Sequence, residues 1–197
     1  HVPLLGDFQQ ENAATVVAAL DVLRQHGEAW ISQEIVDQGL SATTWPGRME
    51  VLNRDPLFIA DSAHNPYSTG KLIESLQSWF PETRWVLIYG ASNDKDIEGM
   101  LKHLLPAVEH VVVTRSYHPR AAAPYALADT CADLGKGAEI AINAERAIEQ
   151  ACRHLKPGMG LLATGSIFIA ADVRAAWSEG KSLQLPRSDW DEEPWPY

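Results

Sequence analysis

LFIADSAHNP, residues 57–66, joins an apolar segment to a polar one in the first half of the chain. The first four residues are continuously apolar, which is typical of a strand that is buried on both faces. The next six carry the carboxylate of Asp61, the imidazole of His64 and the amide of Asn65, directly before Pro66. Reactive side chains at the end of a buried strand predict a ligand site at the carboxyl edge of a parallel sheet.

Segments of strand and helix character alternate on the C-terminal side of this stretch. We expect strands over residues 49–52, 57–60, 85–89, 111–113, 139–142 and 160–164. Helices are predicted over residues 71–80, 97–105, 124–134, 144–155 and 167–177. Continuous apolar strands separated by helices indicate a sheet covered on both faces. The sequence therefore predicts an α/β fold, doubly wound and mostly parallel, with a mixed α+β fold as the alternative.

The N-terminal part has a different organisation. Apolar residues recur at helical spacing over residues 9–26, Gly27 suits a helix stop, and a shorter helix is expected from Ser32 to about Gly39. The pattern breaks at residues 44–47, TWPG. We therefore divide the chain into an arm of linker helices (residues 1–45), a main domain (residues 46–180) and an acidic tail rich in Trp and Pro (residues 181–197), where we expect no regular structure.

Size and charge limit the classes of function. A chain of 197 residues is one ordinary domain, alone or with an arm. The net charge of −10 argues against nucleic acid or an anionic membrane as the main partner. The sequence shows neither a transmembrane run nor a signal peptide. Cys131 and Cys152 lack metal-site spacing, so we interpret them as reduced, partly buried thiols of a cytoplasmic protein.

Four loops are expected at the carboxyl edge of the predicted sheet, within residues 61–68, 90–96, 114–123 and 164–166. Asp61 and His64 could bind a hydroxyl, an amine or a phosphate there. On the residues alone, Asp61 and Asn65 could equally cap the following helix. The segment YHPR, residues 117–120, is interpreted as a solvated loop.

Five short blocks together resemble one family of enzymes. Residues 61–66 (DSAHNP) resemble the DGAHNP loop of the folylpolyglutamate synthases, which belong to the Mur ligase superfamily; Ser62 stands where glycine is usual. The other blocks, in the order expected of that family, are residues 6–14 (GDFQQENAA), 45–50 (WPGRME), 94–96 (DKD) and 160–166 (GLLATGS). Each block is weakly specific, but five in order cover most of the chain.

The resemblance implies an ATP-dependent ligase that adds L-glutamate to the γ-carboxylate of a reduced folate through an acyl phosphate, alone or together with dihydrofolate synthase activity. This chain would be its C-terminal, Rossmann-like domain. Such a domain completes the ATP site and holds the incoming glutamate. Its catalytic contribution would be chiefly positioning and stabilisation of charge.

The resemblance also assigns roles to residues of the nucleotide site. Asn12 would recognise adenine, Arg48 would contact an ATP phosphate, and Asp61 would hold the ribose or help to orient the nucleophile. Each assignment has a structural alternative. Asn12 could be an ordinary surface residue. Arg48 could instead form a surface ion pair, for example with Glu50.

For the second substrate, His64 would lie nearest the transferred phosphoryl group and the incoming glutamate. Ser166 would bind a glutamate carboxylate at the start of a helix, although a plain helix-capping serine explains it almost as well. Lys95 is a further candidate for a glutamate carboxylate, by analogy with the superfamily. No residue of this chain is assigned as a metal ligand.

Part of the expected machinery has no counterpart in this sequence. The family's GTNGKGS-type phosphate loop has no match here, and the ligands of Mg²⁺ and most folate contacts are expected in an N-terminal P-loop domain of the same polypeptide. The chain alone is therefore predicted to be inactive. Another Mur-type amide ligase, or a non-catalytic module that binds nucleotide or glutamate, remains an alternative. A Rossmann oxidoreductase is excluded because no GxGxxG follows the first strand.

Overall fold

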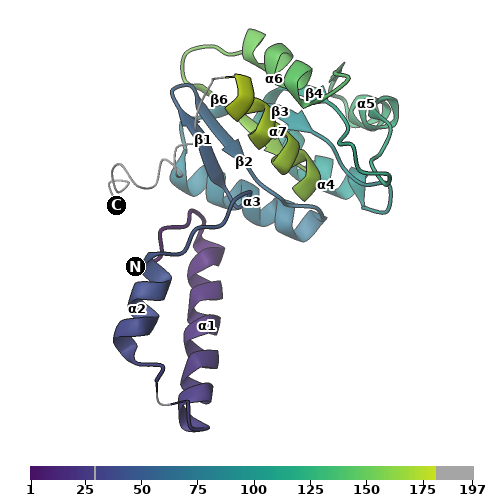
Figure 1. Cartoon of the computed structure of the whole chain (residues 1–197). Helices are drawn as coiled ribbons and strands as arrows, with labels where there is room; N and C mark the ends of the chain where they lie inside the picture. Colours follow the sequence, from purple (N-terminus) through teal and green to yellow (C-terminus); the bar gives the residue numbers. More distant parts are fainter. Residues whose placement is uncertain (29, 181–197) are drawn as a thin grey trace.

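The computed structural model describes residues 1–28 and 30–180, and it contains a helix pair and an α/β body. Helices α1 (Asp7–Gln25) and α2 (Gln33–Ser41) run alongside each other and project from the body (Figure 1). Gly27 follows α1 with φ 105°, and the side chain of Ser32 accepts the N–H of Ile35 at the start of α2. Both predicted helices are confirmed, whereas the predicted tail (residues 181–197) lies outside the described residues.

The body contains a sheet of six strands in the order β1-β2-β6-β3-β4-β5. The strands are β1 (Glu50–Arg54), β2 (Leu57–Ala60), β3 (Arg84–Tyr89), β4 (Val108–Val113), β5 (Glu139–Ile140) and β6 (Met159–Thr164). Strands β2 to β6 are parallel, and only β1 is antiparallel, to β2. The predicted doubly wound, mostly parallel sheet is confirmed.

Helices cover both faces of the sheet, as alternating residues along each strand require. The helices are α3 (Pro66–Trp79), α4 (Ile97–Leu104), the 3₁₀ turn η1 (Leu105–Ala107), α5 (Pro124–Asp133), α6 (Ala144–Arg153) and α7 (Ile167–Gly180). Leu87 and Leu162 point into the core formed with α3, α4 and α5. Their neighbours Ile88 and Leu161 point into the opposite core, formed with α6 and α7.

Several details differ from the sequence-based expectations: β4 begins at Val108 rather than at residue 111, and β5 ends at Ile140 rather than at residue 142. Met49, predicted to begin a strand, lies before β1 with φ 46°, in a conformation that is rare outside glycine. Helix α3 begins at Pro66 rather than at Lys71, because Asn65 accepts the N–H of Ser68 and forms a capping box with it. The expectation that both thiols are partly buried is wrong, because Cys131 is fully buried in the core and Cys152 is exposed.

Long-range contacts attach the N-terminal segments to the body. Leu5, ahead of α1, is fully buried in the same core as Met49. Glu50 is buried, pairs with Arg174 of α7 (Oε1 to Nε, 2.7 Å) and accepts the N–H of Gly47 at 2.9 Å. The turn at residues 47–49 is therefore fixed both by the core that contains Met49 and by Glu50, which connects it to α7. Within the described residues, no helix has the length and hydrophobicity needed to cross a lipid bilayer.

Candidate functional site

Asp61 lies at the carboxyl end of β2, where it holds two segments together. Its Oδ2 accepts the N–H of Met49 at 2.9 Å, and its Oδ1 accepts the N–H of Ala63 at 2.7 Å. Its own N–H donates to the carbonyl of Ala163 in β6 at 2.9 Å. The side chain therefore does not cap α3, which was the alternative interpretation. It fixes the turn that carries Arg48 against the end of its own strand.

The surroundings of Asp61 shift the pKa of its carboxyl in opposite directions. Burial raises the pKa of the Asp61 carboxyl, because a desolvated carboxylate is unfavourable. The two backbone N–H groups, and the nearby charges of Arg48 and His64, act in the opposite direction. Arg48 and His64 thus lie close enough to Asp61 to interact with it electrostatically.

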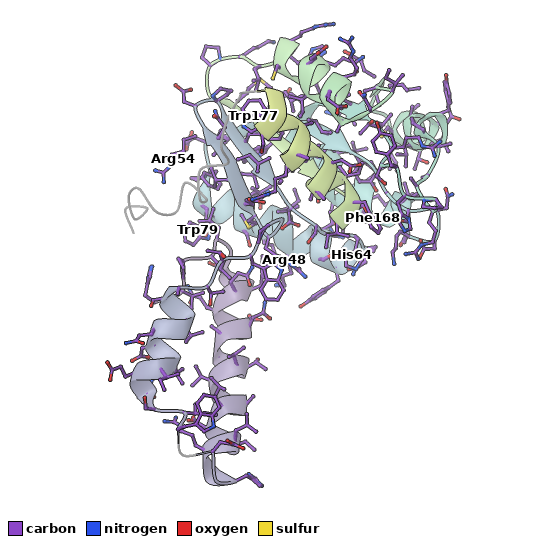
Figure 2. The ribbon with its side chains drawn as sticks, in the orientation of Figure 1. Arg48, Arg54, His64, Trp79, Phe168 and Trp177 are labelled. Atoms are coloured by element: carbon purple, nitrogen blue, oxygen red, sulfur yellow. The ribbon has the colours of Figure 1, made fainter. Side chains whose placement is uncertain are left out.

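A pocket of about 190 Å³ brings the predicted nucleotide-site residues together. Asn12 of α1, Arg48 of the turn before β1 and Asp61 after β2 all line it. Asn12 and Arg48 also line a second pocket, of about 620 Å³, on the side facing Trp45 and α2. Side chains from three separate segments therefore converge where the helix pair meets the body. Figure 2 shows Arg48 at this junction.

The guanidinium of Arg48 has no carboxylate partner among the described residues. Glu50, which the alternative interpretation gave as an example of a partner, pairs with Arg174 and accepts the N–H of Gly47 instead, so the described residues show no Arg48–Glu50 ion pair. Arg48 itself is exposed. An exposed, unpaired guanidinium that lines a pocket is well suited to an anionic ligand such as a phosphate.

His64 lies at the mouth of the same loop, directly before the capping residue of α3. Its Nδ1 is 3.0 Å from the carbonyl oxygen of Ser62, and its backbone N–H donates to the hydroxyl of Ser68 at 3.2 Å. The ring is exposed. If Nδ1 donates to that carbonyl, Nε2 is left as an acceptor toward solvent. Figure 2 shows His64 farther along the same edge of the sheet, near Phe168.

Ser166 follows β6, and its loop touches that of His64. Gly165 has φ 104° and donates its N–H to the carbonyl of Ala63 at 3.1 Å. A Cβ at Gly165 would lie 2.5 Å from Cε2 of Tyr89, so only glycine fits this approach. Ser166 is buried, and its hydroxyl accepts the N–H of Phe168 at 3.2 Å. Ser166 therefore does cap α7, as the structural alternative proposed.

Lys95 occupies the loop after β3. Its Nζ lies 3.4 Å from Oδ2 of Asp94, and Asp96 caps α4 by accepting the N–H of Gly99 at 2.8 Å. Neither Lys95, Ser166 nor His64 lines the 190 Å³ pocket. The structure thus groups Asn12, Arg48 and Asp61 in one pocket. It places the other three residues on adjacent loops of the same carboxyl edge.

The sequence analysis assigned no role to the other residues that line this pocket, which are Phe8, Glu11, Ala63, Tyr67, Ser68, Lys71 and Leu72. Tyr67 and Lys71 are four residues apart on α3 and share one face of it. The hydrogen bond with Glu74 is the largest cause that raises the pKa of Lys71. For Tyr67 and Lys71 the sequence signal was the pair Asn65-Pro66, a helix-capping residue followed by proline. It places the start of the helix five residues before the predicted start at residue 71.

The described residues contain no cluster of potential metal ligands. Across residues 1–28 and 30–180, no three His, Cys, Asp or Glu side chains are placed so that they could hold a metal ion. Any step that requires a divalent cation is therefore not assigned to residues described here.

Comparison with known families gives one assignment. The family model described as "Mur ligase, glutamate ligase domain" matches residues 47–167. A probable bifunctional folylpolyglutamate synthase/dihydropteroate synthase of Halobacterium salinarum is 35% identical over 178 residues, which is 90% of this chain and 21% of that protein. The folylpolyglutamate synthase of Lacticaseibacillus casei is 30% identical over 181 residues, 92% of this chain and 41% of the relative.

Solved structures agree with these relatives. The folylpolyglutamate synthase of Mycobacterium tuberculosis, complexed with ADP and AMPPCP, superposes with a TM-score of 0.81 at 29% identity, over 90% of this chain and 41% of that one. Escherichia coli FolC in complex with DHPP and ADP gives a TM-score of 0.76 at 26% identity, covering 91% and 41%. The chain thus spans less than half the length of the proteins it matches.

Proposed function

Because this chain belongs to the Mur ligase family, as its glutamate ligase domain, we propose that it is the C-terminal domain of an ATP-dependent folylpolyglutamate synthase. The observation that carries the proposal is the convergence of Asn12, Arg48 and Asp61 on one pocket from three segments. Relatives with ADP bound, and relatives named for folylpolyglutamate synthesis, support the same assignment.

In the proposed reaction, the γ-carboxylate of a reduced folate attacks the γ-phosphorus of ATP, which releases ADP and forms an acyl phosphate. The amine of L-glutamate then attacks the acyl carbon, inorganic phosphate leaves, and the amine proton passes to solvent or base. The task of this domain is to hold two polyanions and a second substrate in one geometry. Mg²⁺ would supply charge neutralisation on the phosphates, from ligands outside the described residues.

We assign the nucleotide to the junction between the helix pair and the body. Asn12 contacts the adenine, because its amide can donate and accept along the edge of the base. Arg48, without a carboxylate partner, contacts a phosphate. Asp61 holds the turn that carries Arg48, and we assign it to the ribose or to orienting the nucleophile. The helix pair of residues 1–45 would then form one wall of the ATP site.

We assign the second substrate to the neighbouring loops. His64 lies between the nucleotide pocket and the loop of Ser166, which suits a group that contacts the transferred phosphoryl group and the incoming glutamate. Ser166 and Lys95 would bind glutamate carboxylates. The buried hydroxyl of Ser166 keeps a lone pair while it caps α7, so capping and binding are compatible.

The test is ADP formation by the full-length protein with ATP, L-glutamate and a reduced folate. We expect activity that requires both glutamate and folate, and an increase of about tenfold or more in KM for ATP in Arg48→Ala, because a charge-assisted contact is worth about 1.5–3 kcal/mol. Arg153→Ala, an exposed arginine on α6, is the matched control. Dihydropteroate and cell-wall precursors as acceptors separate this function from dihydrofolate synthases and other Mur-type ligases.

The purified chain of residues 1–197 provides the complementary measurement. It contains no phosphate loop of the GxxxxGK(S/T) type, so we expect it to release no ADP with glutamate and folate. ADP release by this chain alone, or activity of the full-length protein that does not depend on folate, would overturn the proposed function.

A further inference from the structure

Backbone hydrogen bonds attach the loop of residues 114–123 to a neighbouring loop, although residues 117, 119 and 120 are exposed, as expected of a solvated loop. It leaves β4 and lies against the loop that follows β3. Ser92 and Ala121 form an isolated antiparallel bridge. The N–H of Asn93 donates to the carbonyl of Arg120 at 2.8 Å, and the N–H of Ala122 donates to the carbonyl of Ala91 at 2.8 Å. The loop after β3, which carries Lys95, is therefore held by the loop after β4.

The side chain of Arg120 reinforces this attachment at the position of Lys95. Oδ2 of Asp94 lies 3.4 Å from Nη1 of Arg120 and 3.4 Å from Nζ of Lys95. One carboxylate is thus shared between two cations, so the group carries a net positive charge. Because Arg120 competes for Asp94, the ammonium of Lys95 is only partly neutralised. It remains able to attract an anionic ligand.

His118 connects the same loop to Ser166. Its ring stacks on the ring of Phe168, with centroids 3.9 Å apart and planes 14° apart. Its Nδ1 accepts the N–H of Arg120 at 3.2 Å, so the neutral ring carries its proton on Nε2. Phe168 in turn donates its backbone N–H to the hydroxyl of Ser166. On α7, burial raises the pKa of the Asp172 carboxyl, and the backbone of Tyr117 acts in the opposite direction.

One loop therefore contacts a neighbour of each proposed carboxylate-binding group, namely Asp94 beside Lys95 and Phe168 beside Ser166. Arg120 acts on Lys95 through Asp94, and His118 acts on Ser166 through Phe168. Because the loop is attached to both neighbours, a change in the loop would alter the separation between Lys95 and Ser166. An amino acid with two carboxylates needs such a fixed separation, because removal of one methylene shortens it by roughly 1.5 Å, one C–C bond.

We propose that Arg120 and His118 are positioning residues that make the amino-acid site selective for glutamate over shorter dicarboxylic amino acids. This inference rests on the proposed function. Neither residue is assigned a contact with the reacting atoms. Their role is to hold Lys95 and Ser166 at the spacing that L-glutamate spans and L-aspartate does not.

The experiment measures steady-state kinetics of the full-length protein with L-glutamate and with L-aspartate. In Arg120→Ala and His118→Ala we expect KM for glutamate to rise about threefold to tenfold, KM for ATP to stay within about twofold, and the ratio of kcat/KM for glutamate over aspartate to fall by a similar factor. Arg120→Lys and His118→Phe keep the charge and the stacked ring respectively, so they should recover most of the selectivity.

Arg115→Ala is the matched control, because Arg115 is exposed in the same loop and forms no ion pair among the described residues. Unchanged selectivity in Arg120→Ala and His118→Ala would overturn the proposal. So would parallel increases in KM for ATP and for glutamate with a lower melting temperature, since these indicate a purely structural role.

The two proposals fail in different ways. If the wild-type protein forms no ADP with glutamate and folate, the proposed function fails. The positioning role is then judged by the glutamate-dependent rise in melting temperature of the wild-type protein. A rise that aspartate does not produce, and that Arg120→Ala abolishes, supports it. No rise with glutamate overturns it as well.

Discussion

Replacement of Asp61 by alanine tests whether this carboxylate holds the turn at residues 47–49. The substitution removes the acceptor of two N–H groups, those of Met49 and Ala63, at residues that are buried. A buried donor left without a partner costs about 1–3 kcal/mol, so the gross loss is about 2–6 kcal/mol. Relief of one buried charge returns part of this. We expect the free energy of unfolding to fall by about 2 kcal/mol or more.

Urea denaturation of the chain, followed by fluorescence, gives the midpoint and slope from which this change is calculated. Asp129→Ala, an exposed position on α5, is the control and should change stability by less than about 0.5 kcal/mol. Asp61→Asn keeps one acceptor oxygen and removes the buried charge, so it should cost less than Asp61→Ala. A loss below about 1 kcal/mol in Asp61→Ala would refute the reasoning that these two hydrogen bonds fix the turn.

The difference in stability between the wild type and Asp61→Asn should depend on pH. Burial raises the pKa of Asp61 in the folded chain above its ordinary value of 3.8. The unfolded state therefore releases the proton more readily, so the contribution of Asp61 to stability is present below about pH 3.8 and is lost as the pH rises through the folded pKa. Relative to Asp61→Asn, the wild type should be most stable at low pH. The opposite trend would contradict the direction of the shift.

Two further predictions concern a close backbone approach and the two thiols. Gly165→Ala should destabilise the chain by more than about 2 kcal/mol, because the new Cβ would overlap Tyr89 and the backbone φ is positive. Gly158→Ala, also at positive φ but with open space around it, should cost about 1 kcal/mol. Equal losses of stability in urea denaturation would argue against the overlap. In thiol labelling at pH 8, Cys152 should react rapidly and Cys131 only on unfolding, because burial raises the pKa of Cys131 to about 11; rapid reaction of both thiols in the native chain would contradict the buried environment.

The strands and helices of the body were largely predictable, since their apolar periodicity reflects burial on the two sheet faces. The antiparallel direction of β1 was also accessible from the sequence. Only Asp55 and Pro56 separate it from β2, and a parallel pair needs a crossover of a dozen or more residues. The early start of α3 at Pro66 was missed because apolar spacing begins only later in that helix, although Asn65-Pro66 marked the cap.

Other features had no local signal. The pairing of Glu50 with Arg174 joins residues 124 positions apart, and it decides that Arg48 lacks a carboxylate partner. The stacking of His118 on Phe168 likewise depends on the lateral order of β4, β3 and β6 in the sheet. Residues 117–120 are exposed apart from the half-buried His118, as the solvated-loop interpretation predicted, but their contacts with neighbouring loops had no local signal. The candidate residues were identified individually, but which of them share a pocket is a property of the tertiary structure.

The helix pair leaves the body at Leu5 and returns to it at Gly47, and both positions are buried in the body. The first turn of α1 is attached to the body as well, because Phe8 packs against its core and Oδ1 of Asp7 accepts the indole N–H of Trp79 at 3.4 Å. Asn12 follows one turn later on this anchored end of α1, and it lines the same two pockets as Arg48 of the body. A ligand that contacts both side chains would therefore bridge the helix pair and the body, and would oppose any change in their relative orientation.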